Sequence, residues 1–145
     1  MVSLLLMLQA APLSDGAHLR WVADRYAIPS QLFQGVAYTE SRNNLRAGKA
    51  WKCSLRAERC AWGRFQLRLA TAKDYCDSTA TLAQVKRYGW NVECAAATLA
   101  ALRRACDSWV CAIKAYYRGL DGRDTPAVAA YVSSVYSYAG ALAWP

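Results

Sequence analysis

Side chains that can donate or accept a proton near neutral pH are scarce in this sequence. The 145 residues hold three glutamates, at Glu40, Glu58 and Glu93, and one histidine, at His18. A single histidine argues against a His-rich metal site and against a Ser-His-Asp triad. Any acid–base chemistry of this chain therefore depends first on its glutamates.

Glu40 stands at the end of an apolar helical stripe. The apolar positions that precede it are Leu32, Phe33, Val36 and Ala37. Continuing their spacing of three and four residues leads to Glu40, so the pattern predicts a carboxyl group that faces the core. Burial and the negative end of the helix dipole both disfavour the carboxylate, and we expect a raised pKa suited to a general acid. The alternative is a helix-end residue paired with Arg42 or Arg46.

The cysteines form the second group of residues with chemical potential. They are Cys53, Cys60, Cys76, Cys94, Cys106 and Cys111. Their spacing lacks the close pairs typical of zinc sites, so the even number predicts disulfides and an oxidising compartment, with buried free thiols as the alternative.

The expected helices limit which cysteines can pair. Cys53 and Cys60 bracket one irregular segment, and Cys106 and Cys111 flank a turn between two helices, which leaves Cys76 for Cys94. Cys106–Cys111 is the weakest of these pairs, because five residues on one continuous helix would point the side chains apart.

The bulk composition bounds the class of protein. An apolar fraction of 55% and a charged fraction of 19% fit one folded domain and exclude a disordered chain. The net charge of +8 predicts attraction to nucleic acid, an anionic membrane or an anionic cell-wall polymer. Basic residues stand singly or in pairs, and no recognition-helix or zinc-finger pattern is present, so we expect no nucleic-acid partner.

The first residues differ from the rest of the chain. Residues 1–13 are an apolar segment that resembles a secretory leader but lacks a positively charged start, so we expect a leader or an uncleaved apolar segment there. Residues 14–145 are expected to form a single domain. No other stretch approaches the roughly 20 apolar residues of a membrane span, and we expect no stable membrane span.

Helical periodicity covers most of residues 14–145. We expect helices that begin near Ser14 or Asp15, at Pro29, near Thr71, at Leu82, at Asn91, at Asp107 or Ser108, and at Thr125-Pro126. Residues 43–61 lack a helical stripe and are expected to form an irregular insert, with a β-hairpin as the alternative. The prediction is a compact all-α bundle of six or seven helices, or α+β at most.

Several short segments follow one another in this order along the chain: Ala23 to Leu32 with Tyr26, Ile28 and Pro29; Tyr38-Thr39-Glu40-Ser41-Arg42-Asn43; Gly63-Arg64-Phe65-Gln66-Leu67 with Ala70-Thr71-Ala72; Asn91-Val92 with Leu99 and Leu102; Ala112 to Gly119; and Tyr131-Val132 with Val135. Together these segments resemble one family, the lytic transglycosylases with a soluble-lytic-transglycosylase domain, relatives of goose-type lysozyme. Each match is short, but the set follows the family order over about residues 18–140. The resemblance implies a lysozyme-like catalytic domain.

The resemblance also implies a reaction. Members of this family cleave the β-1,4 bond between N-acetylmuramic acid and N-acetylglucosamine in peptidoglycan, with one glutamate and no metal or cofactor. Glu40 would be the catalytic acid and then the base that closes a 1,6-anhydro ring on the muramic acid. The family-matched candidates for supporting Glu40 and lining the glycan groove are Ser41, Gln66, Tyr116 and Tyr131.

Location and partners follow from the same resemblance. It implies a periplasmic or extracellular protein, or one carried on a virion, that acts on peptidoglycan glycan strands. A larger secretion-system or phage virion assembly is the expected further partner.

The chain departs from the family pattern at four places. Tyr117 stands where the family usually has asparagine, and Arg64-Phe65 replaces a smaller apolar pair before Gln66. Ala95 or Ala96 replaces a glycine, and the cysteine-bearing insert at 45–61 is longer than in the simplest members.

Two other functions compete with the transglycosylase. A lysozyme-type hydrolase needs a second carboxylate to orient water, and Glu58 is the nearest in sequence, with Asp74 and Asp77 behind it. Arginines next to Glu58 favour a surface ion pair instead. The second alternative is a non-catalytic glycan-binding component of an envelope or virion assembly, which would not need a carboxyl group on an apolar stripe.

Overall fold

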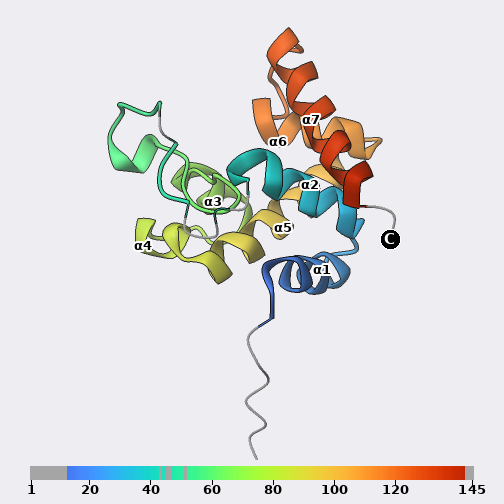
Figure 1. The fold of residues 1–145 in the computed structure, drawn as a ribbon. Coiled ribbons are helices and arrows are strands. Elements are labelled where there is room, and N and C mark those ends of the chain that lie inside the picture. Colours follow the sequence, from blue (N-terminus) through green and yellow to red (C-terminus); the bar gives the residue numbers. More distant parts are fainter. Residues whose placement is uncertain (1–12, 43, 45–46, 51, 143–145) are drawn as a thin grey trace, which may run out of the picture.

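Helices dominate the computed structural model, which describes residues 13–42, 44, 47–50 and 52–142 (Figure 1). They are α1 (Asp15–Arg25), α2 (Ser30–Ser41), the 3-10 helix η1 (Ala57–Arg59), α3 (Leu69–Tyr75), α4 (Leu82–Lys86), α5 (Tyr88–Ala105), α6 (Trp109–Arg118) and α7 (Pro126–Leu142). The described residues contain no strand, and their β-type pairing consists of two isolated antiparallel bridges, from Trp62 to Lys49 and from Trp62 to Leu67. The predicted all-α class is confirmed.

Short polar side chains fix where several helices begin. The Ser14 hydroxyl accepts the backbone N–H of Ala17 at the start of α1, and Ser108 does the same for Cys111 at the start of α6. Thr81 and Gln84 form a reciprocal capping box at α4. These caps satisfy N–H groups that the first helical turn leaves without a partner.

The expectation that Asn91 begins a helix is wrong. Helix α5 begins three residues earlier, at Tyr88, and the Asn91 side chain is fully buried inside it. Its amide bonds the segment that precedes α3, accepting the N–H of Phe65 at 2.8 Å and donating to the carbonyl of Trp62 at 2.9 Å. Asparagine often caps helices, but here its side chain joins α5 to the segment before α3 instead.

Helix α5 is the centre of the fold and packs against α1, α3, α4 and α6 (Figure 1). The fully buried alanines Ala95 and Ala96 allow that close packing. On another side, α2 packs along α7. Gly35 makes this possible, because a Cβ there would lie 2.5 Å from the carbonyl oxygen of Val135. The close approach brings the end of α2 that carries Glu40 against α7.

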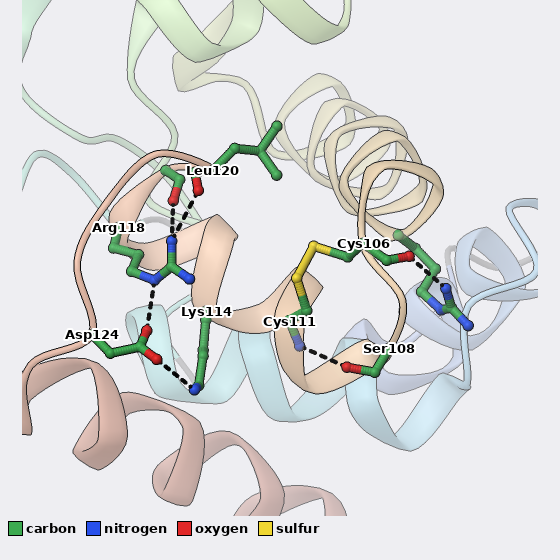
Figure 2. The surroundings of a disulfide bond; sticks show 9 residues. Cys106, Ser108, Cys111, Lys114, Arg118, Leu120 and Asp124 are labelled. Atoms are coloured by element: carbon green, nitrogen blue, oxygen red, sulfur yellow. Dashed lines mark hydrogen bonds and ion pairs between the residues drawn. A yellow bond between two sulfur atoms is a disulfide. The ribbon is translucent and has the colours of Figure 1, made fainter.

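All six cysteines are paired in the structure. The disulfides are Cys53–Cys60, Cys76–Cys94 and Cys106–Cys111, with Cα–Cα distances of 5.9, 5.5 and 5.6 Å. These are the pairs that the expected helices favoured. The geometric objection to Cys106–Cys111 does not apply, because α5 ends at Ala105 and α6 begins only at Trp109 (Figure 2). The bridge therefore crosses a corner between two helices.

Within the part of the chain that the structure describes, no helix combines the length and apolar character of a membrane span. The predicted apolar segment at 1–13 lies outside the described residues except for Leu13, which is exposed.

Candidate active site

Glu40 lies in the last turn of α2 and faces a cleft of about 440 Å³. The side chain is half-buried at the end of the apolar stripe. Other residues that line the cleft come from the insert, from the turn before α3, and from α3, α5 and α6, among them Gln66, Thr71, Tyr75, Tyr116 and Tyr117. Glu40 is the only carboxylate among the described lining residues. Among the described lining residues, Glu40 is therefore the carboxyl group available for proton transfer near neutral pH.

Two opposing influences act on the Glu40 carboxyl group. Burial raises its pKa from 4.5 to about 7, and a hydrogen bond from Tyr131 works in the lowering direction. The Tyr131 hydroxyl on α7 donates to Glu40 Oε1 at 2.6 Å. Near neutral pH both the acid and the carboxylate are accordingly populated, which suits a group that first donates and later accepts a proton.

A second tyrosine borders Glu40 without bonding it. The Tyr116 hydroxyl on α6 donates to the backbone carbonyl of Phe65 at 2.8 Å. Burial, and secondly the charge on Glu40, hold the pKa of Tyr116 well above its usual value, and the pKa of Tyr131 is raised by the same two causes. Both phenols stay protonated and act as hydrogen-bond donors.

Gln66 belongs to a tight turn that borders the cleft. Its Nε2 donates to the carbonyls of Gly63 and Gly48, at 2.9 and 3.0 Å. The turn needs glycine at position 63, where φ is +81° and a Cβ would lie 2.5 Å from Nδ2 of Asn91. The side-chain amide of Gln66 thus ties the turn to the insert at the border of the cleft.

Arg64 is the feature that the sequence analysis missed. Its side chain is only 2% exposed, and it forms an ion pair with Asp15 of α1 at 3.1 Å. Its Nη1 also donates to the carbonyls of Ala37, at 2.6 Å, and of Arg42 at the end of α2. A buried guanidinium thus satisfies carbonyls at the C-terminus of the helix that carries Glu40. The sequence does hold one signal of this role: position 64 carries a charged residue where the family that the chain resembles has a small apolar one.

Ser41 lies next to this arginine and is absent from the described lining of the cleft. Its hydroxyl oxygen is 2.6 Å from the carbonyl oxygen of Arg64 and 2.5 Å from Arg64 Nη1. The serine therefore connects the end of α2 to the 63–66 turn. The structure separates it from Gln66 and Tyr116, which do line the cleft.

The alternative of an ion pair for Glu40 finds no support in the described residues. The Arg42 guanidinium lies over the rings of Tyr38 and Tyr138, 5.9 and 5.5 Å from their centroids. Arg46, the other suggested partner, lies outside the described residues.

The remaining glutamates lie away from the cleft. Glu58 is exposed on η1 with its Oε2 4.0 Å from Arg56, as the arginines around it indicated. Glu93 on α5 pairs with Arg25 and accepts a hydrogen bond from Tyr26. The described residues also hold no cluster of three or more His, Cys, Asp or Glu side chains that could bind a metal ion.

Comparison with known proteins identifies one family. A family profile described as Transglycosylase SLT domain matches residues 19–132, a stretch that includes both Glu40 and Tyr131. Comparison with curated proteins and with solved structures gives no match. Members of the matched family are lytic transglycosylases, and their substrate is peptidoglycan. Because the profile spans well over half of the chain, this protein belongs to the transglycosylase SLT domain family.

Proposed function

We propose that this protein is a lytic transglycosylase that cleaves the β-1,4 bond between N-acetylmuramic acid and N-acetylglucosamine in peptidoglycan. The observation that carries the proposal is Glu40, whose pKa is raised to about 7, in a cleft within the matched family region. The neutral acid donates its proton to the glycosidic oxygen as that bond breaks through an oxocarbenium-like transition state. The resulting carboxylate takes the proton of the muramic acid C6 hydroxyl, whose oxygen attacks C1 and closes the 1,6-anhydro ring.

The neighbouring side chains support this cycle in different ways. Tyr131 orients the carboxyl group through its 2.6 Å hydrogen bond and stabilises the carboxylate after proton donation. Tyr116 and Gln66 border the cleft, where the glycan strand binds. Ser41 positions the end of α2 through Arg64 and acts on the substrate only indirectly.

The domain and its location belong to the same proposal. Residues 14–145 form one catalytic domain, and residues 1–13 are a leader or an uncleaved apolar segment. Three disulfides and a cell-wall substrate favour a site of action outside the reducing cytoplasm. We place it in the periplasm, outside the cell or on a virion, where it opens peptidoglycan for a larger secretion-system or phage assembly.

The products of the reaction test the proposal. Purified peptidoglycan incubated with the protein should release muropeptides that end in 1,6-anhydromuramic acid, lighter by one water than the hydrolysed form, as measured by mass spectrometry. Reducing muramic ends alone would instead identify a lysozyme-type hydrolase and make Glu58→Gln the next variant. Binding to peptidoglycan without any release would identify the non-catalytic alternative.

The hydrogen bond from Tyr131 predicts a change in the pH profile. Tyr131→Phe removes a donor that favours the carboxylate, so the pKa of Glu40 rises and the alkaline limb of kcat/KM moves to higher pH. We expect kcat to fall about five- to tenfold, because the hydrogen bond that orients the acid is lost. Tyr136→Phe is the control, since Tyr136 is 41% exposed on the same helix and does not line the cleft. If the alkaline limb of kcat/KM is unchanged in Tyr131→Phe, Tyr131 does not influence the pKa of Glu40.

A further inference from the structure

Tyr117 is an aromatic residue in the cleft that the reaction just described does not use. It follows Tyr116 on α6, lines the cleft together with Glu40, and remains 49% exposed. Its ring stacks on that of Tyr131, with the centroids 4.6 Å apart and the planes at 24°. One face is thus covered by the residue that bonds Glu40, while Tyr117 remains largely exposed and contributes to the lining of the cleft.

The position of Tyr117 is fixed from both ends of its helix. At the start of α6, Ser108 caps the helix and the Cys106–Cys111 disulfide ties it to α5 (Figure 2). At its end, the Arg118 guanidinium donates to Asp124 and to the carbonyl of Gly119, at 3.0 and 2.8 Å (Figure 2). The backbone that carries Tyr117 is therefore held at both ends of the helix, and the stacking on Tyr131 orders the ring itself, which lowers the entropic cost of binding.

A fixed, half-exposed aromatic ring beside the reacting group suits one kind of ligand surface. The C–H groups of a β-linked pyranose form an apolar face about as broad as a phenol ring, and burying both apolar surfaces is favourable. The related family usually has asparagine at this position, which can only offer hydrogen bonds. We infer that Tyr117 is a stacking platform for a pyranose ring of the glycan strand, immediately beside the bond that faces Glu40; this rests on the proposed function.

The test separates binding from turnover. Glu40→Gln protein, which should bind glycan without cleaving it, is titrated with chitohexaose by isothermal calorimetry, alone and with a second substitution at position 117. Tyr117→Phe keeps the stacking face and should change Kd by less than about twofold, whereas Tyr117→Ala and Tyr117→Asn should weaken binding about five- to tenfold. Tyr136→Ala, a half-exposed tyrosine outside the cleft, is the matched control and should leave Kd unchanged.

A purely structural role for Tyr117 gives a different result. If the ring only packs over Tyr131, Tyr117→Ala lowers the unfolding temperature and shifts the pH profile of the active protein while Kd stays constant, and the stacking platform is then wrong. It is also wrong if chitohexaose does not bind the Glu40→Gln protein at all. Neither result bears on the proposed reaction, which is tested separately by the anhydro products of the wild-type protein.

Discussion

Glu40→Gln is expected to lower the rate of peptidoglycan cleavage by about two to four orders of magnitude. The amide keeps the size of the carboxyl group and can still contact the Tyr131 hydroxyl, but it cannot donate a proton to the glycosidic oxygen. The rate of muropeptide release measures the effect. Glu58→Gln is the matched control, because Glu58 is exposed on η1 and outside the cleft, and it should keep wild-type activity.

The stability of Glu40→Gln distinguishes lost chemistry from lost folding. Burial favours the neutral acid, so between pH 4.5 and about 7 the folded chain holds more protons than the unfolded chain. The wild-type fold therefore loses stability as the pH rises through that window. Glu40→Gln has no charge to bury, and above neutral pH it should be more stable than wild type by up to about 2–3 kcal/mol in urea unfolding. Below pH 4.5 the two proteins should be about equally stable.

Arg64→Met is expected to produce the largest loss of stability, about 3–5 kcal/mol in the free energy of unfolding. Methionine fills much of the space but leaves Asp15 without its ion pair and removes the hydrogen bonds from Arg64 Nη1 to the carbonyls of Ala37 and Arg42. Thermal and urea unfolding, monitored by circular dichroism, measure the change. The stability of Arg64→Lys should lie between that of Arg64→Met and that of wild type, because lysine keeps the charge but not the fork of donors.

An exposed ion pair provides the control for this measurement. Arg25 pairs with Glu93, and both side chains are substantially exposed, at 47% and 34%. Arg25→Met should therefore cost less than about 1 kcal/mol. Equal losses for Arg25→Met and Arg64→Met would show that burial of the Arg64 network does not set its contribution to stability.

How much of the site could be predicted depends on how far apart its residues lie in the sequence. The placement of Glu40 follows from local periodicity, because the side chains at positions 32, 33, 36 and 37 set the buried face of α2. Its bond to Tyr131 crosses 91 residues, and no spacing rule reaches that far. From the sequence, only the resemblance to a known family indicates that Tyr131 belongs to the site.

The buried polar residues also depend on partners that are far away in the sequence. Asparagine is a common helix-capping residue, yet the amide of Asn91 is fully buried and accepts a hydrogen bond from the segment before α3. Arg64 looks like one more surface cation in a basic chain, yet its partner Asp15 lies 49 residues away. Local preference predicts the exposed state of such residues because exposure is their usual state. Their burial depends on partners that only the folded chain brings together.

In the proposed reaction the C6 hydroxyl of muramic acid, and not water, takes the place of the leaving sugar. Digestion of peptidoglycan in water enriched in heavy oxygen tests this most directly, with the muramic ends of the released fragments analysed by mass spectrometry. We expect 1,6-anhydro ends that carry no heavy oxygen, and no such fragments from Glu40→Gln protein. Reducing muramic ends that carry heavy oxygen would show instead that water attacks C1 and that the protein is a hydrolase.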